Sequence, residues 1–400
     1  MVDVCQSVKD PEDTKQCRDQ PHMHDFVSLL SDPRYDILAF KDVADLSREE
    51  KLAVAECMDK VLLAFLEEIG FQLYSPQRDH KLRKDLWAWG RCTLVAVCDG
   101  GWSQAEHILE GSASIVEHFF PLARRDSRLH LAFAVAVALH VELSATKASY
   151  AESLAYFTFN LLLQKNNQEE WQTMYAGVIK GFVEHFGAND PRIGTLGAVS
   201  LAQFIETAST EHSFSKRLPP HLSSVHPEGE KLNRGSSDGF AYFFRILSGV
   251  PGPFISGLVK PSKHEEVSYD YWITSVVNLT TFMNLANDLL SWPKEVRSGE
   301  TQNYMSLQTR ARQQAGTPSQ FQLEGKWTFR DTLCETIKTL IYVANRTYTE
   351  AERSAWNADL ASRTWVGFKH GFISWHLRQP RYGLNHLLGG ICSGSEKGVF

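Results

Sequence analysis

A long, predominantly apolar run between residues 269 and 292 most constrains what this chain can fold into. It reads YDYWITSVVNLTTFMNLANDLLSW, with polar side chains only at intervals. A run of this length and residue mixture is typical of a mostly buried helix. The run therefore predicts one central helix around which the rest of the chain is arranged.

Three polar residues at the end of this run, Asn287, Ser291 and Glu295, are spaced four positions apart. On a helix each turns about 40° from the previous one, so the three share one face. The rise from first to last is about 12 Å, which the lean of helical side chains and the reach of Glu shorten. An amide oxygen, a hydroxyl and a carboxylate are oxygen ligands that suit Mg²⁺. Water molecules and substrate phosphate oxygens complete the coordination of this ion. The alternative is a polar stripe on a partly exposed helix, which is the commoner meaning of so short a match.

The remainder of the chain also carries helical patterns. Apolar residues recur at helical spacing between Ser47 and Phe71, and Ser47 and Glu50 are placed as a capping box. A second helix is expected over 80–97 and is stopped by the Gly pair at 100–101. Further helices are expected near residues 103–120, 126–144, 150–165, 167–185, 192–207, 328–349 and 351–377. Strand signals are poor, so the predicted fold class is all-α.

Charge and cysteine content limit the functions that this chain can have. The chain has 400 residues, a formal net charge of −6 and no long basic run, so no nucleic-acid partner is expected. Seven scattered cysteines show no metal or redox spacing, which favours reduced thiols in a cytoplasmic protein. The polar N-terminus lacks a signal-peptide core, and no apolar stretch is free enough of polar residues to predict a membrane span.

The composition along the chain predicts a single domain. We expect an all-α domain over residues 26–388, between flexible tails at 1–25 and 389–400. Two stretches rich in polar residues, Gly and Pro, 209–239 and 298–325, are expected to be long loops. Loops of that length in a compact domain are usually functional or disordered, and here they would flank the mouth of one site.

Two motifs carry a family resemblance. The string at 287–295, NDLLSWPKE, resembles the second metal motif of class I terpene synthases, most of all in the trichodiene-synthase-like branch, where a Lys precedes the Glu as Lys294 does here. The segment from His370 to Leu377, followed by Arg381 and Tyr382, resembles the C-terminal segment of the same proteins. There an Arg-Tyr pair closes over the substrate diphosphate. Residues 183–187, VEHFG, also resemble the family, and the likeness extends over about 115–385.

The resemblance implies a class I terpene-synthase helical bundle around a central apolar pocket. It also implies Mg²⁺-assisted ionisation of a prenyl diphosphate, with farnesyl diphosphate as the expected substrate, followed by carbocation rearrangement. In that interpretation Asn287, Ser291 and Glu295 hold one metal ion, and Lys294, Arg381 and Tyr382 bind the leaving diphosphate. Arg381 offers a bidentate fork and Tyr382 one donor to phosphate oxygens.

The chain also departs from the family pattern. The family's Asp-rich motif falls on Ser144-Ala145-Thr146-Lys147-Ala148, where all of its carboxylates are missing, so fewer than the family's three Mg²⁺ ions are expected. Glu142 is interpreted as an ordinary helix glutamate that points about 200° away from that motif. The family's diphosphate-sensing Arg falls near Val199, where there is no basic residue. Pro293 lies inside the metal motif and removes a backbone donor just before Glu295.

Aromatic residues on expected buried faces would supply the pocket walls, where their rings can stabilise a carbocation. They are Phe157, Phe159, Phe204, Phe243, Phe244, Trp272, Phe282 and Trp375. Because the Asp-rich motif is missing, two alternatives stay open. One is an enzyme that couples a terpenyl cation to an external nucleophile, forming a C–N or C–O bond, or that acts on a modified terpene. The other is a non-catalytic protein that binds a terpenoid or a partner. A homodimer is also left open.

Overall fold

The computed structural model describes residues 23–40, 43–163, 169–217, 239–321 and 325–393. Within these ranges the regular elements are helices, and the β-type pairing consists of two isolated bridges. The predicted all-α fold class is therefore confirmed. The predicted tails lie mostly outside the described ranges, and helices α1 (Met23–Leu30) and α18 (Leu387–Ser393) stand at the two ends of what is described.

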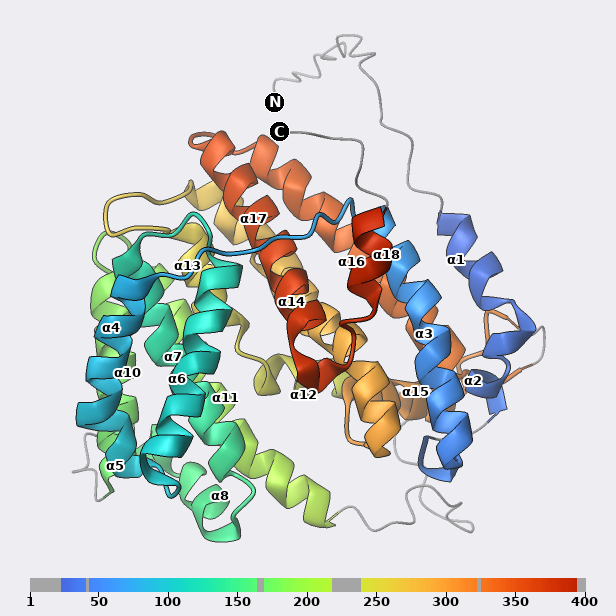
Figure 1. Cartoon of the computed structure of the whole chain (residues 1–400), viewed down its shortest axis with the longest axis horizontal. Coiled ribbons are helices and arrows are strands. Elements are labelled where there is room, and N and C mark those ends of the chain that lie inside the picture. Colours follow the sequence, from blue (N-terminus) through green and yellow to red (C-terminus); the bar gives the residue numbers. More distant parts are fainter. Residues whose placement is uncertain (1–22, 41–42, 164–168, 218–238, 322–324, 394–400) are drawn as a thin grey trace, which may run out of the picture.

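The apolar run forms the longest helix of the described chain, α14 (Tyr269–Ser298), which runs through the middle of the bundle (Figure 1). It ends at Gly299, whose φ of 74° is the left-handed conformation that suits a glycine cap. The helix continues through Pro293, which is buried inside it. Eighteen residues of α14 are buried, so the helix is covered on most sides, as its composition predicted.

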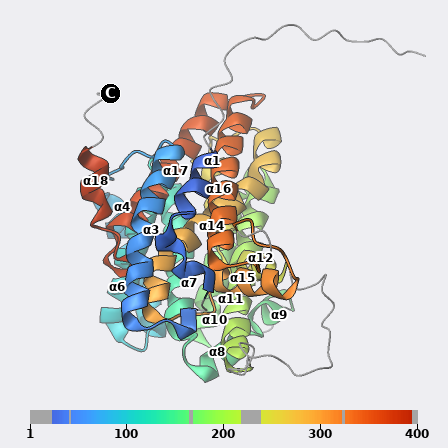
Figure 2. The same ribbon diagram turned by 90° about the vertical axis from the view of Figure 1, so that its right-hand side faces the viewer.

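Long helices surround α14 on both sides (Figures 1 and 2). α16 and α3 pack against it most extensively, and α13, α17 and α15 also contact it. The longer helices of the bundle are α3 (Arg48–Glu68), α6 (Gly101–Phe119), α7 (Arg125–Ser144), α10 (Glu170–Phe186), α11 (Pro191–Arg217), α16 (Phe329–Glu352) and α17 (Ala358–Arg378). The shorter ones include α2 (Ile37–Phe40), α4 (His80–Trp89), α5 (Val95–Val97), α8 (Ala148–Leu154), α9 (Phe157–Leu162), α12 (Phe240–Ser248), α13 (Pro251–Val259) and α15 (Tyr304–Gln314).

Local sequence explains several helix ends. Ser47 caps α3 through the predicted capping box, in which its hydroxyl accepts from the Glu50 amide and the Glu50 carboxylate accepts from the Ser47 amide. Thr328 and Asp331 form a second capping box at the start of α16. α12 and α13 meet at Gly249 and Val250 with a bend of 64°, and Pro251 opens α13 at a position where proline is tolerated.

Some expected boundaries and burials were wrong. The helix expected over 150–165 is divided into α8 and α9, and the loop expected from Ser209 begins later because α11 continues to Arg217. The remainder of that loop, 218–238, lies outside the described residues. The second expected loop contains α15. Phe159 and Phe243 are exposed rather than buried, whereas the other six aromatic residues named for the pocket walls are buried.

One described helix, α7, is long and apolar enough to cross a membrane, and the bent α12–α13 pair passes the same test only when taken together. Most of the apolar window of α7 is buried inside the bundle. A core helix of a globular protein has the same character, so this finding is weak support for a membrane span.

Candidate functional site

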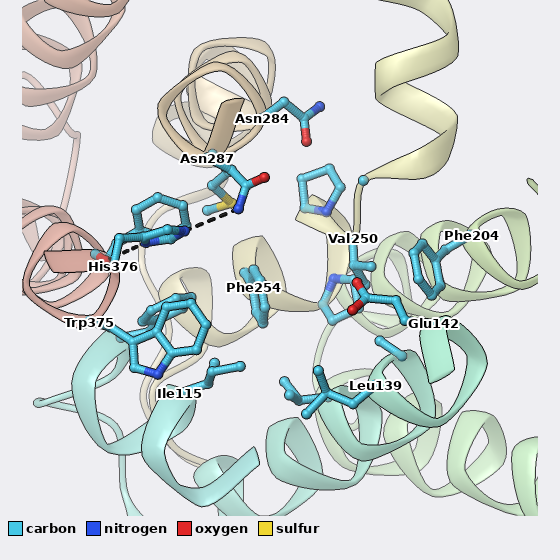
Figure 3. A pocket seen from close by; sticks show the side chains of 18 of the residues that line it. Ile115, Leu139, Glu142, Phe204, Val250, Phe254, Asn284, Asn287, Trp375 and His376 are labelled. Carbon is cyan, nitrogen blue, oxygen red and sulfur yellow. Dashed lines mark hydrogen bonds between the residues drawn. The ribbon is translucent and has the colours of Figure 1, made fainter. Parts of the chain in front are cut away.

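A cavity of about 180 Å³ lies between α7, α14 and α17, and we call it the central cavity (Figure 3). Its walls are mainly apolar and aromatic. The aromatic residues that line it are Phe119, Phe204, Phe254, Phe372, Trp375 and Tyr382. The ring of Phe119 lies within 6 Å of the rings of Phe254, Phe372 and Trp375, so these walls are held by mutual aromatic contacts.

A second cavity of about 330 Å³ adjoins the first, and we call it the acidic compartment. The two share lining residues, among them Glu142, Arg245 and Asn287. Five carboxylates line the acidic compartment, namely Glu142, Glu211, Asp288, Glu295 and Glu300. Arg245 is the one cationic side chain among its described lining residues. An apolar chamber thus adjoins one that is rich in carboxyl groups.

The three residues expected to bind metal differ in their placement. Asn287 lines both cavities, and Glu295 lines the acidic compartment with 8% of its surface exposed. Ser291 is buried and lies between them on α14, about one turn from each. Its hydroxyl donates to the Asp288 carbonyl at 3.4 Å. The Glu295 carboxylate interacts with Ser291 as well, so all three belong to one face of the helix.

Two neighbours fix the Asn287 amide. Its Nδ2 donates to Nε2 of His376 at 3.0 Å, because the other ring nitrogen of His376, Nδ1, donates to the Phe372 carbonyl at 2.8 Å (Figure 3). Burial lowers the pKa of His376 to about 3, with Arg381 lowering it further, so the ring is neutral and can accept. The Asn287 Oδ1 accepts from Arg245 at 3.0 Å. The amide oxygen therefore faces the shared part of the two cavities.

Arg245 on α12 is the cation of this site, and the sequence interpretation missed it. Its Nε donates to both Asp288 oxygens at 2.9 Å. The position where the family pattern would place a sensing arginine, Val199, is half exposed on α11. The sequence comparison looked for this cation near Val199, where no basic residue lies, and it did not consider α12. A signal was present in the sequence, because Arg245 is the single charge in the apolar stretch FAYFFRILS.

Glu142 also differs from its sequence interpretation. It lies in the last turn of α7 and lines both cavities, reaching toward the space that Asn287 faces from the opposite wall (Figure 3). Its side chain keeps an accessible surface inside the cavities, yet the protein around it displaces enough water to raise the pKa of its carboxyl group. The charges of Arg381, Arg245 and Lys294 oppose that shift. Of the segment after it, where the Asp-rich motif was sought, Ala145 lines the acidic compartment, whereas Lys147 forms an ion pair with Asp99.

Of the three residues expected to bind diphosphate, two line the central cavity, and Lys294 lines neither cavity. Arg381 and Tyr382 both line the central cavity, and the Arg381 Nη2 donates to the Tyr382 hydroxyl oxygen at 2.6 Å. The Arg381 guanidinium also lies 5.3 Å from the centre of the Trp375 ring. Lys294 is half-buried on α14 and acts electrostatically, since its charge lowers the pKa of both Glu142 and Glu295.

The oxygen atoms of this site fit a hard divalent cation. Burial raises the pKa of Glu295 to about 7, and its Oε2 is buried without a hydrogen-bond donor. A carboxylate oxygen in that situation is stabilised by a cation. Among the described residues no group of three His, Cys, Asp or Glu side chains is close enough to hold a metal alone. Mg²⁺ commonly takes only one or two carboxylates and completes its shell with water and phosphate, so the set remains suitable.

Curated proteins with similar sequences are terpene synthases. The chain is 27% identical over 161 residues to terpene synthase 29 of Postia placenta, an alignment that covers 40% of this chain and 41% of that protein. It is 23% identical to an (E)-beta farnesene synthase of Metarhizium brunneum, covering 70% of this chain and 75% of the relative. It is 22% identical to terpene synthase BipA of Cochliobolus sativus, in an alignment that covers 66% of this chain and 73% of the relative.

Two further comparisons complete this result. A solved structure of a single-substitution variant of cucumene synthase aligns with 77% of this chain and all of its own, at 13% identity and a TM-score of 0.46. No protein-family model matches the chain. The curated relatives agree with the motif-based resemblance to terpene synthases.

Proposed function

We propose that this chain, which is similar to class I terpene synthases, is a terpene cyclase-like enzyme that ionises a prenyl diphosphate, with farnesyl diphosphate as the expected substrate. One observation carries the proposal: an apolar, aromatic-lined cavity adjoins, and shares lining residues with, a compartment that holds oxygen ligands and a guanidinium. A prenyl diphosphate has the matching halves, a hydrocarbon chain and a metal-binding anion.

The polar end of the site has groups for both metal and diphosphate. Asn287, Ser291 and Glu295 would hold Mg²⁺, which when bound supplies Lewis-acid assistance to the leaving diphosphate. Arg245 and Arg381 present guanidinium groups from α12 and from the segment after α17, which suits the binding of phosphate oxygens from two sides. The anionic leaving group would then be held where charge develops, which is the usual largest source of such rate enhancement.

The apolar end of the site suits the carbocation that ionisation of the prenyl diphosphate would leave. The rings of Phe119, Phe254 and Trp375 face the central cavity and can stabilise positive charge through their π electrons. The same walls are largely buried, so they exclude bulk water that would quench the cation early. This arrangement favours an enzyme over a passive terpenoid carrier, because a carrier of a neutral hydrocarbon has no use for the carboxylates and arginines gathered at one end.

The experiment that tests the proposal is incubation of the purified protein with farnesyl diphosphate and Mg²⁺, followed by solvent extraction, product analysis and measurement of released pyrophosphate. We expect terpene product and pyrophosphate, both lost in the Glu295→Ala protein. Geranyl and geranylgeranyl diphosphate should be run in parallel to find the chain length. Pyrophosphate release without a hydrocarbon or terpene alcohol would favour transfer of the terpenyl group to another nucleophile.

An inactive protein needs a second measurement. If no prenyl diphosphate is consumed and neither Mg²⁺ nor pyrophosphate raises the melting temperature, the proposal fails and the binding-protein alternative gains. A ligand at 100 times its Kd should add about 2.7 kcal/mol to the free energy of unfolding, which a thermal melt detects.

A further inference from the structure

Arg381 and Tyr382 belong to a very short element that follows α17, the 3-10 helix η5 (Pro380–Tyr382). Two backbone hydrogen bonds of 3.1 Å close this turn, and the later one runs from the Gly383 amide to the Pro380 carbonyl. A single turn of this kind is marginal by itself, because so few hydrogen bonds hardly offset the entropy of ordering its residues. The position of the Arg381 guanidinium therefore depends on what holds the turn in place.

A side chain of α14 holds this turn from outside the cavities. Arg297, in the last turn of α14, donates from its Nη2 to the Tyr382 carbonyl at 2.8 Å. Its Nε donates to the Pro293 carbonyl at 3.1 Å, so the guanidinium is also fixed on its own helix. One planar group thus joins the helix of the expected metal ligands to the turn that carries Arg381.

The residue that ends the turn leaves room for this contact. Gly383 has a φ of 68°, which lies in the left-handed region that favours glycine. A Cβ added at Gly383 would lie 2.5 Å from the Arg297 Nη2 and 3.1 Å from its Cζ. The guanidinium therefore packs directly against the glycine backbone, and a larger residue there would displace it. This close approach supports the anchoring contact independently of the hydrogen bond to Tyr382.

The turn also fixes the guanidinium that faces the cavity. The Arg381 Nη2 donates to the Tyr382 hydroxyl oxygen at 2.6 Å, and the buried Tyr382 ring lies 4.8 Å from the ring of His376. Tyr382 is therefore held by Arg297 through its backbone, and it holds Arg381 through its side chain. Arg297 itself lines neither cavity, so any effect it has on a bound diphosphate passes through this turn.

We propose that Arg297 is a positioning residue for diphosphate binding, because it holds the Arg381–Tyr382 turn against the end of α14. This inference rests on the proposed function, since it concerns how the same site binds the diphosphate. Glu295 lies two residues before Arg297 on α14, so the expected metal ligand and the Arg381 guanidinium are kept at a fixed spacing. A diphosphate that contacts both the cation and Arg381 is then bound by a site that is already ordered.

A double-mutant cycle with Mg²⁺ and inorganic pyrophosphate tests this role in the full-length protein. Arg297→Ala should weaken pyrophosphate binding by roughly tenfold, because the loss of one hydrogen bond made by a charged group has that size. In the Arg381→Ala background the same substitution should change the affinity by less than about twofold, because the two residues act as one unit. Isothermal titration measures the four affinities.

The matched control for the loss of charge is Arg363→Ala. Arg363 is exposed on α17, pairs with Asp359 of the same helix at 2.9 Å and lines neither cavity. The Arg363→Ala protein should bind pyrophosphate as the wild type does.

Two further measurements examine the anchoring contact itself. Backbone hydrogen exchange over residues 380–384 should be faster in the Arg297→Ala protein, because an unanchored turn opens more often. Gly383→Ala disturbs the same contact from the other side and should also weaken pyrophosphate binding. Gly316→Ala is its control, since Gly316 has a φ of 71° and no atom within 4 Å of an added Cβ. It carries similar backbone strain without displacing Arg297, so it should keep the wild-type affinity.

Unchanged hydrogen exchange of the turn or unchanged pyrophosphate affinity in the Arg297→Ala protein overturns the inference. An equal loss of affinity with and without Arg381 also overturns it, and so does a wild type that binds no pyrophosphate. Circular dichroism and thermal melting check the fold, and the comparison of Gly383→Ala with Gly316→Ala decides if Arg297→Ala does not fold. The proposed function fails separately: a protein that shows the expected cycle but consumes no prenyl diphosphate keeps the role of Arg297 and loses the terpene-synthase chemistry.

Discussion

The orientation of one amide decides whether the site can bind a cation. An Asn side chain can present either its oxygen or its nitrogen to a cavity, and only the oxygen is a metal ligand. Here the neutral ring of His376 accepts from the Asn287 Nδ2, and its own Nδ1 is tied to the Phe372 carbonyl. His376 is therefore a positioning residue, since it acts on the metal site through Asn287.

The first prediction follows from this contact. Replacing His376 with Ala removes the acceptor, so the Asn287 amide can rotate, and Mn²⁺ affinity should fall by roughly 10–100-fold. His376→Gln keeps an acceptor oxygen and should restore most of that affinity. Isothermal titration with Mn²⁺ and pyrophosphate measures both, with melting temperatures recorded beside them. Equal loss of affinity in the two proteins would show that His376 serves only in packing.

The second prediction concerns Arg381. Its guanidinium lines the central cavity and is held by Tyr382 and Trp375. Arg381→Ala should weaken pyrophosphate binding by about 10–100-fold, because a hydrogen bond to a charged group contributes about 1.5–3 kcal/mol. Arg378→Ala is the control one turn earlier, since Arg378 donates to Ser75 and does not line the cavity. Similar pyrophosphate affinity in the two variants would contradict the assigned role.

Sequence spacing could place some of these residues and not others. Asn287 and Glu295 lie on one helix, so a period of 3.6 residues fixes their common face. Glu142 and Arg245 depend on how α7 and α12 are rotated against α14, and no local pattern encodes that rotation. The angle of about 200° expected for Glu142 refers to a motif whose carboxylates this chain lacks, so it does not describe where Glu142 lies relative to α14.

At the scale of elements, the strongly patterned helices were the most predictable. α14 begins where the apolar run begins, and α3 carries the expected capping box. α12 and α13 were not anticipated, because they are short, lack a side-chain N-cap and are separated by a bend of 64° near two prolines. These two helices are stabilised by packing against α11, α14 and α15, and such tertiary contacts cannot be read from the local sequence.

The third prediction tests the closest helix contact beside the site. At Gly371, where α17 crosses α6, an added Cβ would lie 1.8 Å from the His118 carbonyl oxygen. That oxygen is backbone and cannot rotate away, so Gly371→Ala should cost about 3 kcal/mol or more. Gly177→Ala on α10 is the matched substitution, with no atom within 4 Å of the new Cβ. It should stabilise by about 0.5–1 kcal/mol.

Chemical denaturation of the two variants measures both changes. A Gly371→Ala protein as stable as the wild type would mean that α17 and α6 can separate without loss. Because α17 carries Trp375 and His376 into the central cavity, such a separation should also be visible as reduced affinity for Mn²⁺ and pyrophosphate.

For the whole molecule, two sets of desolvated groups set the dependence of stability on pH. The carboxyl groups of Glu211 and Glu295 have pKa values of about 7 in the folded chain, above their ordinary 4.5, because desolvation penalises their charged forms. The histidines His185, His370 and His376 have pKa values of about 4, 4 and 3, below their ordinary 6.5, for the same reason. The two sets titrate in opposite directions.

One set of groups loses its contribution to stability as the pH rises and the other as the pH falls, so the metal-free protein is most stable at an intermediate pH. The raised carboxyl groups contribute stability that is complete below pH 4.5 and is lost as the pH rises through 7. The lowered histidines contribute stability that is complete above pH 6.5 and is lost as the pH falls toward 4 and 3. Above about pH 6.5 the histidine contribution is nearly complete while that of the carboxyl groups is still being lost, so the metal-free protein should become less stable toward pH 8.

The last prediction is that Mg²⁺ reverses this loss. A cation binds ionised carboxylates, so the rise in melting temperature caused by Mg²⁺ should be larger at about pH 8 than at about pH 6, where protons compete for the same oxygens. Melting curves at these two values and at neutral pH, with and without Mg²⁺, measure it. In the Glu295→Gln and Glu211→Gln proteins the metal-free melting temperature should fall less across this range, and in the Glu295→Gln protein the Mg²⁺ effect should also shrink. Glu206→Gln is the control, because Glu206 lies on α11 outside both cavities, and it should behave as the wild type. An Mg²⁺ effect of equal size at both ends of the range would mean that the cation binds elsewhere than at these carboxylates.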